Sequence, residues 1–200
     1  AAGLSYLDTD GHSVTPQRLR NGAEKENDHY HNWTASTRLG WAVSETLEAG
    51  FVGRYVEADK TNTDPELEDA FGFGTTEDQD AYLNTSQYFL RGHGKAALLG
   101  GLWDSSLAVA YTHYDRKSRN DREDPSTETL DRSNFKGDKL KFEWKNDLYL
   151  LEDHIFTVGL ETEKETSKSS GFTDFAGFVI DQDTDADGRT SAVYLQDQYS

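Results

Sequence analysis

The chain has 200 residues, and its 37 acidic and 20 basic side chains give a formal net charge of −17 at pH 7. This charge repels phosphate backbones and excludes non-specific binding to nucleic acid. Cysteine is absent, which excludes disulfides, zinc–thiolate sites and thiol nucleophiles. The longest stretch without a polar side chain is residues 96–103. It is too short for a membrane-spanning helix of roughly 20 residues, but a barrel strand needs only about 10.

Apolar and polar side chains alternate in steps of two residues along much of the chain, which is the period of a β-strand. Within residues 33–43 most odd positions are apolar or aromatic, and the even positions are mainly small or polar. Within residues 139–148, Leu140, Phe142 and Trp144 alternate with charged side chains. A helix would bury charge among these apolar groups, so the pattern predicts strands.

The pattern predicts an all-β fold, an antiparallel up-and-down meander of about eight strands. In chain order, the expected strands are residues 1–8, 31–44, 46–59, 81–99, 105–116, 137–150, 154–167 and 190–199. Short and long connections alternate between them. The short ones are residues 44–46, 100–104 and 151–153, and the long ones are residues 9–30, 60–80, 117–136 and 168–189. In an antiparallel meander, this alternation places all the long connections at one end of the sheet.

Two kinds of β-protein are compatible with this organisation. Short turns at one end and long loops at the other are typical of a transmembrane β-barrel, the interpretation that we favour. The alternative is a soluble, acidic β-sandwich that binds carbohydrate or calcium, with the charged alternate positions on a solvated outer face. A wholly disordered chain is less consistent with the 12% aromatic content. We find no catalytic motif and do not expect an enzyme.

Seven segments of the sequence, most of them in expected strands, allow a comparison with known proteins. They are Leu-Ser-Tyr-Leu-Asp-Thr-Asp-Gly (4–11), Arg-Leu-Gly-Trp (38–41), Gly-Arg-Tyr-Val-Glu-Ala-Asp (53–59), Ala-Val-Ala-Tyr-Thr-His-Tyr-Asp-Arg (108–116), Lys-Phe-Glu-Trp-Lys-Asn-Asp (141–147), Thr-Val-Gly-Leu-Glu (157–161) and Ala-Val-Tyr-Leu-Gln-Asp-Gln (192–198). In order and spacing they resemble barrel strands of TonB-dependent outer-membrane receptors. Within that family, the vitamin-B12 and siderophore receptors are the most similar.

This resemblance implies that residues 1–200 are a partial barrel domain, part of a larger transmembrane β-barrel and without the family's plug domain and TonB box. It implies a location in the bacterial outer membrane and a role in the active import of a scarce metal chelate, either cobalamin or a siderophore. The implied partners are outer-membrane lipid, the metal-chelate ligand and TonB, which would act through the missing plug domain.

On this interpretation, one face of each strand meets lipid and the other meets the lumen, where polar groups contact the plug or line the path of the substrate. The lipid-facing residues are expected to include Trp33, Leu39, Trp41, Phe51, Tyr55, Phe142, Trp144, Phe156 and Leu160. The lumen-facing residues are expected to be Arg38, Arg54, Gln87, Arg91, Lys141, Glu143, Glu161 and Gln196.

A candidate metal site lies in the last expected long loop, where Asp181, Asp183, Asp185 and Asp187 occupy every second position. Calcium takes about six to eight hard oxygen ligands, and alternating aspartates in a tight loop supply several of them. The bidentate Glu of an EF-hand is missing from this stretch. We therefore predict a Ca²⁺ site in an extracellular loop, with a merely solvated acidic loop as the alternative. The resemblance to vitamin-B12 receptors, which hold calcium with loop aspartates, favours the calcium interpretation.

Overall fold

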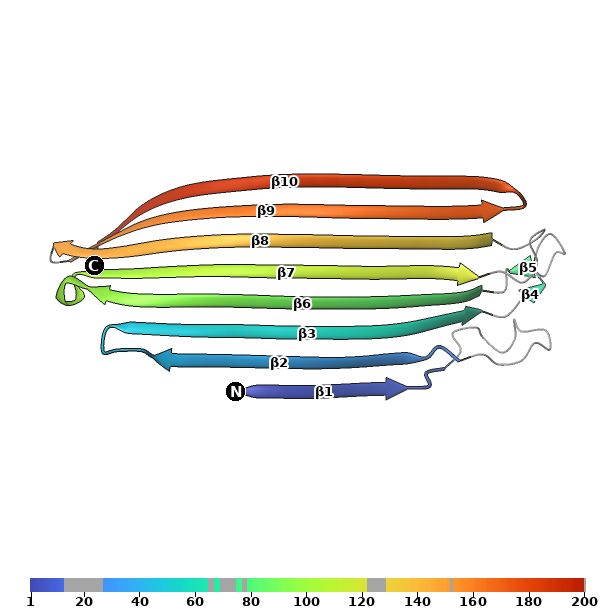
Figure 1. Ribbon diagram of the computed structural model, residues 1–200, viewed down its shortest axis with the longest axis horizontal. Helices are drawn as coiled ribbons and strands as arrows, with labels where there is room; N and C mark the ends of the chain where they lie inside the picture. Colours follow the sequence, from blue (N-terminus) through green and yellow to red (C-terminus); the bar gives the residue numbers. More distant parts are fainter. Residues whose placement is uncertain are drawn as a thin grey trace.

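A computed structural model describes residues 1–12, 27–64, 67–68, 75–76, 79–121, 129–151 and 153–199 (Figure 1). Its main feature is one 8-stranded antiparallel sheet in which the strands lie in chain order. The strands are β1 (Ala2–Thr9), β2 (Tyr30–Ala42), β3 (Leu47–Asp64), β6 (Gln79–Leu98), β7 (Trp103–Asp121), β8 (Thr129–Leu151), β9 (His154–Phe175) and β10 (Phe178–Tyr199). A separate pair is formed by β4 (Leu67–Glu68) and β5 (Thr75–Thr76), and the turn after β6 is a short 3₁₀-helix, η2 (Leu99–Gly101). Among the described residues, no helix is long and apolar enough to cross a membrane.

The antiparallel meander predicted from the sequence is confirmed. Each strand pairs with its neighbour in the chain, without a crossover among the described strands. The two ends of the sheet differ in their connections (Figure 1). The short connections at one end are residues 43–46, 99–102 and 152–153, and the longer ones at the other end are residues 10–29, 65–78 and 122–128. Much of each longer connection lies outside the described residues.

The prediction of a fourth long connection over residues 168–189 is wrong. β9 continues to Phe175 and β10 begins at Phe178, so Ala176 and Gly177 alone join the two strands. The expected loop at residues 117–136 is likewise shorter than predicted, because much of it belongs to β7 and β8. In these regions both faces of the sheet carry polar side chains. The apolar alternation that reveals a strand is therefore lost, although backbone pairing continues.

The turn between β9 and β10 is a two-residue hairpin. Phe175 pairs with Phe178, and the central residues Ala176 and Gly177 have φ angles of 49° and 85°. Two central residues with positive φ define a type I′ turn, whose twist matches that of the flanking strands. The Asp174 carboxylate accepts a hydrogen bond from the Gly177 N–H at 3.1 Å. Ala-Gly is a weaker signal for this turn than Asn-Gly or Asp-Gly, so the sequence alone did not reveal it.

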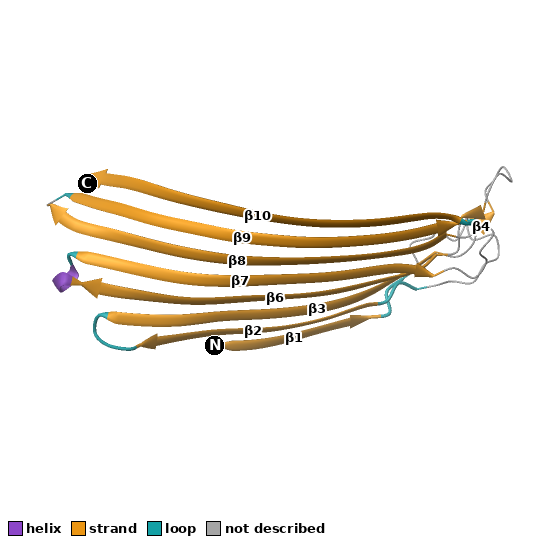
Figure 2. Cartoon of the chain, turned by 45° about the horizontal axis from the view of Figure 1, so that its top comes forward, coloured by secondary structure: helices purple, strands orange, loops and turns teal. Residues whose placement is uncertain are grey.

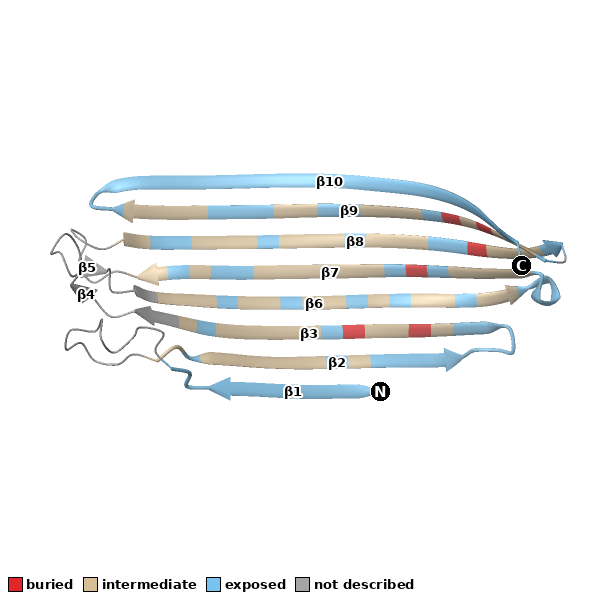
Figure 3. Cartoon of the chain, turned by 180° about the vertical axis from the view of Figure 1, so that it is seen from behind, coloured by how far each residue is buried: buried red, intermediate tan, exposed pale blue. Residues whose placement is uncertain are grey.

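The sheet is a single layer with no enclosed core (Figure 2). Among the described residues, Ala108 is the one buried apolar side chain, and the few buried positions lie in the half of the sheet nearer the short turns (Figure 3). The chain exposes 13728 Å², whereas a compact monomer of this size exposes about 9,500 Å². Both faces and both edge strands, β1 and β10, are open, which fits a section of a larger barrel.

Replacing Gly177 by Val should weaken the β9–β10 hairpin, because a β-branched residue is strained at a φ of 85°. We expect the free energy of unfolding, measured by urea titration, to fall by about 1–3 kcal/mol. Gly92→Val is the matched control, because a Cβ added at Gly92 meets no atom within 4 Å and the φ of Gly92 is not positive. Equal losses of stability in the two variants would contradict the assigned turn.

Candidate functional site

The strand register divides the side chains of the sheet between two faces. Paired residues of neighbouring strands share a face, and successive residues alternate between faces. Leu107 and Trp144 are one such pair and define the apolar face, whereas Ala108 and Glu143 are the next pair and define the polar face. All the residues expected to meet lipid lie on the apolar face, namely Trp33, Leu39, Trp41, Phe51, Tyr55, Phe142, Trp144, Phe156 and Leu160.

The apolar face is apolar only in the half of the sheet near the short turns. Its side chains there form a continuous surface, the apolar belt. The belt comprises Leu39, Trp41, Leu47, Phe51, Leu90, Leu98, Trp103, Leu107, Val109, Leu140, Phe142, Trp144, Phe156, Leu160, Val193 and Leu195. At the β10 edge, Val193 and Leu195 are 71% and 78% exposed. An exposed apolar surface of this extent marks an interaction surface, because soluble monomers rarely have one.

Aromatic side chains form the boundary between the apolar belt and the polar half of the same face. This aromatic row consists of Tyr6, Trp33, Tyr55, Tyr88 and Tyr111, one each from β1, β2, β3, β6 and β7. The ring centroids of Trp33 and Tyr55 are 4.8 Å apart, and those of Tyr88 and Tyr111 are 5.8 Å apart. The row therefore extends from β1 to β7, with ring contacts that join β2 to β3 and β6 to β7.

The polar tips of the aromatic row bind carboxylates that lie on its other side, away from the belt. The indole N–H of Trp33 and the hydroxyl of Tyr55 each donate a hydrogen bond to Glu57 at 3.0 Å. The hydroxyl of Tyr111 donates to Asp138. Each ring thus has its apolar body beside the belt and its polar group among charged residues. Tyrosine and tryptophan adopt this arrangement where an apolar layer meets water.

A second set of aromatic residues borders the belt at the short turns. Trp41 on β2 lies eight residues from Trp33, and Trp103 on β7 lies eight residues from Tyr111. Eight residues span about 27 Å along a strand. With a tilt of roughly 40°, this is about 21 Å across an apolar layer, near the ~25 Å band of transmembrane barrels.

The opposite, polar face carries the residues that the sequence predicted for a lumen. The register places the whole predicted set on this one face: Arg38, Arg54, Gln87, Arg91, Lys141, Glu143, Glu161 and Gln196. The structure brings Arg91, Lys141, Glu143 and Glu161 into contact with one another. Arg38, Arg54, Gln87 and Gln196 share the face but make none of the contacts of this cluster.

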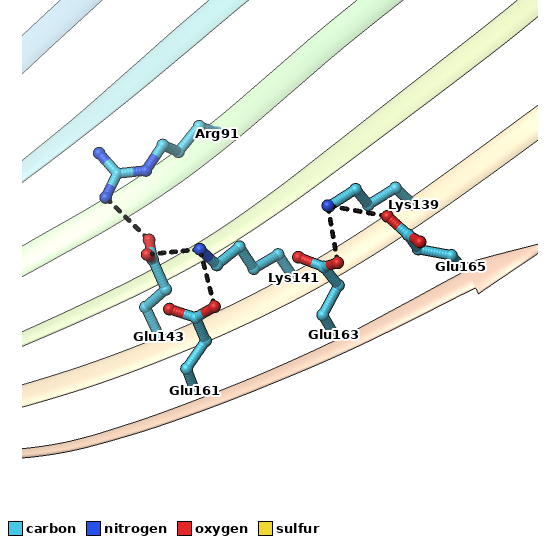
Figure 4. Close-up of polar contacts among 7 residues, drawn as sticks. All are labelled: Arg91, Lys139, Lys141, Glu143, Glu161, Glu163 and Glu165. Atoms are coloured by element: carbon cyan, nitrogen blue, oxygen red, sulfur yellow. Dashed lines mark hydrogen bonds and ion pairs between the residues drawn. The ribbon is translucent and has the colours of Figure 1, made fainter. Parts of the chain in front are cut away.

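The charged network on the polar face joins residues of β6, β8 and β9 (Figure 4). Glu143 on β8 accepts from Arg91 on β6 at 3.2 Å and pairs with Lys141 at 3.1 Å. Lys141 also pairs with Glu161 on β9 at 3.0 Å. These partly exposed pairs hold the side chains in place and contribute little to stability individually. They leave a fixed pattern of charge on an open surface.

Lys139 forms a second part of the network that the sequence analysis missed. Its ammonium group lies 2.7 Å from Glu163 and 2.8 Å from Glu165 (Figure 4). The alternation of residues 139–148 shows which face Lys139 occupies, but not which residue of the next strand it meets. That partner depends on the β8–β9 register, for which the sequence contains no signal before the turn is known.

A hollow of about 330 Å³ adjoins the network on the side of the short turns. His93 and Tyr194 line it, and each ring lies over a glycine of the neighbouring strand. A Cβ at Gly50 would approach the His93 ring to 2.3 Å, and one at Gly159 would approach the Tyr194 ring to 2.0 Å. Any other residue at these glycines would displace the rings, so the shape of the hollow depends on them.

The four aspartates of the predicted calcium loop lie in a strand instead. Asp181, Asp183, Asp185 and Asp187 occupy alternate positions of β10, on the same side of the sheet as the apolar belt. The Lys168 ammonium pairs with Asp185 at 3.1 Å. Within the described ranges, no group of three or more His, Asp or Glu residues is arranged to hold a metal ion. The predicted loop is wrong, and calcium binding stays a prediction without geometric support.

Comparison with known proteins gives a relationship in structure but not in sequence. No family model matches the chain, and no curated protein matches it significantly. The fold is similar to that of the ferric yersiniabactin uptake receptor FyuA from Yersinia pestis, with a TM-score of 0.63 and 9% sequence identity over 99% of this chain. The chain spans 31% of the length of that receptor. At this identity, the likeness shows that the two share a fold and no more.

Exchanging charges tests the network around Lys141. Lys141→Glu or Glu161→Lys alone brings like charges together and should lower the free energy of unfolding. The double variant should regain part of this loss. We expect a coupling energy of about 0.2–1 kcal/mol from a double-mutant cycle followed by urea unfolding. A cycle between Glu161 and Lys168, which lie on opposite faces, is the control and should be additive. Equal coupling in the two cycles would contradict a specific Lys141–Glu161 contact.

Proposed function

We propose that this chain forms part of the barrel wall of a receptor in the bacterial outer membrane. The receptor binds a scarce metal chelate and imports it, with energy that TonB supplies through a plug domain. The apolar belt faces lipid, and the polar face lines the lumen. The chain performs no chemistry on the ligand, so its residues bind, guide and hold other parts of the receptor.

The aromatic row beside the apolar belt is the observation that carries this proposal. Trp33, Tyr55 and Tyr111 turn their rings toward the belt and their hydrogen-bonding groups toward Glu57 and Asp138. Such rows are typical of the two interfaces of a membrane-spanning barrel. A soluble sandwich would cover its apolar face with a second sheet, and no such sheet packs on the belt in the described part of the chain.

The polar face supports a lumen. Its charges are arranged as mutual pairs, with Arg91, Lys141 and Lys139 each held between or beside carboxylates. Such a surface stays hydrated and presents hydrogen-bonding groups to a passing ligand or to a domain inside the barrel. Lipid contact on this face would leave these charges without water, at a high cost in free energy.

The type of ligand is the most specific part of the proposal. A metal chelate of the siderophore class is supported by the structural similarity to a receptor for ferric yersiniabactin uptake. Cobalamin has only the resemblance of the strand segments in its favour. The action of TonB and of a plug domain likewise comes from that resemblance, and transport belongs to the complete receptor.

Tryptophan fluorescence can test the membrane orientation, because all four tryptophans lie on the apolar face. They are Trp33, Trp41, Trp103 and Trp144. The test uses single-tryptophan variants of the complete receptor, in each of which every other tryptophan is replaced by phenylalanine, reconstituted in lipid. Bromine on the lipid tails should quench Trp144 most strongly. Trp33 and Trp41 lie at the borders of the belt and should be quenched best by bromine near the headgroups. Absence of quenching in all the single-tryptophan variants would contradict the proposal.

Two neighbouring residues of β3 provide a matched test of the two faces. Phe51 lies on the apolar face in the middle of the belt, and Val52 lies on the polar face between Arg38 and Arg91. Phe51→Glu should lower the free energy of unfolding in lipid by on the order of 2 kcal/mol or more, because the charge faces hydrocarbon. Val52→Glu should change it little, because two arginines flank the new carboxylate. Equal effects would contradict the assignment of lipid and lumen.

A further inference from the structure

The border between the apolar belt and the polar half of the same face runs obliquely across the sheet. The register row that contains Tyr6 and Trp33 reaches β7 at Asp115, whereas the aromatic residue of β7 is Tyr111, four residues nearer the belt. Because β7 is the fourth neighbour of β1 in the sheet, the border shifts by one residue per strand. With about 3.4 Å per residue and about 4.8 Å between strands, this shift corresponds to a strand tilt of roughly 35°, which is within the range of transmembrane barrels.

The same shift predicts where the border lies on β9 and β10, which the aromatic row does not reach. Tyr111 shares its register row with Lys164 of β9 and Arg189 of β10. The border then falls two residues nearer the belt on β9, at Thr162, and three residues nearer the belt on β10, beside Ser191. The hydroxyl groups of these two residues are 3.0 Å apart, and the next row toward the short turns belongs to the belt.

Two basic side chains lie directly beyond this border. Lys164 and Arg189 face each other across the β9–β10 pairing, on the same side of the sheet as the belt, and both are exposed. Within the described residues, neither forms an ion pair or a hydrogen bond through its side chain. Asp187, one row farther from the belt, pairs with neither of them. The neighbouring Lys168, by contrast, binds Asp185 at 3.1 Å.

An anion from outside the sheet would stabilise this pair. Like charges directly opposite each other destabilise a sheet, and these two occur together in a chain with a net charge of −17, where carboxylates are abundant. Ammonium and guanidinium groups both donate strong hydrogen bonds to phosphate oxygens. At the border of an apolar belt that faces lipid, the phosphate groups available are those of lipid headgroups. Their acyl tails extend from this level along the belt.

We propose that Lys164 and Arg189 bind a phosphate group of a lipid headgroup, in the leaflet on the side of the longer connections. The inference rests on the membrane orientation proposed above and adds a specific lipid contact to it. The phosphate would lie between the ammonium and guanidinium groups. The acyl tails would lie against Leu160 and Val193, which belong to the belt on the same two strands.

The test uses the complete receptor in vesicles of phosphatidylcholine, with Trp144 as its single tryptophan. Trp144 is paired with Leu160, on the belt side of the two cations. Bromine is placed on the tails of either phosphatidylcholine or phosphatidic acid, at the same mole fraction. The ratio of the two quenching efficiencies measures the preference for phosphatidic acid, which the wild type should show. Lys164→Gln/Arg189→Gln should lower this preference by about fivefold or more, because each basic side chain near a membrane surface contributes roughly this factor.

Lys117→Gln/Lys136→Gln is the matched control. It removes the same charge from the same side of the sheet, but at positions farther from the belt. Lys136 also pairs with Asp115 at 3.6 Å. This variant should change the preference by less than about twofold, because salt screens charges at that distance. Circular dichroism and thermal unfolding would verify that both double variants fold.

Inorganic phosphate tests the source of the phosphate group. When it is added at the concentration of the phosphatidic acid headgroup, the preference should stay unchanged, because burial of the acyl tails against the belt holds the lipid in place. Loss of the preference would assign the two cations to free phosphate and overturn the proposed lipid contact.

Equal quenching by the two lipids in the wild type would overturn the inference and leave the receptor function intact. An unchanged preference in Lys164→Gln/Arg189→Gln, or an equal loss in the control variant, would do the same. Absence of quenching by both lipids would instead contradict the membrane orientation proposed above, and this inference with it.

Discussion

The structure depends on the antiparallel backbone pairing of eight consecutive strands. Because successive side chains alternate between faces, a single register determines the environment of every residue in a strand. A slip of one residue in β8 would exchange Trp144 for Lys145 on the belt and destroy both surfaces at once. The pairing therefore does more than hold the strands together. It keeps an apolar surface and a charged surface about one strand thickness apart without a core between them.

The two ends of the sheet differ in the polarity of their faces. Near the short turns, one face is apolar and the other charged, and the aromatic row borders this region from β1 to β7. Beyond the row, both faces carry mainly polar side chains, with exceptions such as Phe135 and Phe172, and the strands continue to the hairpin at Gly177. In this second region water reaches both sides of the sheet, and ion pairs such as that between Lys168 and Asp185 supplement the backbone pairing.

The features that depend on side-chain alternation could be predicted from the sequence. Those that depend on strand register, or on strands with polar side chains on both faces, could not. The faces of Phe142 and Lys141 follow from period two, so the belt and the lumen set were predictable. The partners of Lys139 were not, because they require the β8–β9 register. Residues 168–189 carry polar groups on both faces, so a paired strand resembled a loop, and the aspartates of β10 were assigned to a metal-binding loop. The fold is also similar to that of a known receptor at 9% sequence identity, so comparison of the sequences alone did not reveal this similarity.

The long polar extension of β9 and β10 makes part of the wall tolerant of change in length. An insertion of one residue inside the belt would move its leucines to the polar face and charged residues to the apolar face. The same insertion between Thr166 and Phe175 would mostly exchange one polar side chain for another, with Phe172 as the exception. Such a hairpin can lengthen, shorten or shift while the register of the apolar belt stays fixed. In the receptor proposed above, this end of the wall can thus acquire a new shape without any change in the apolar belt.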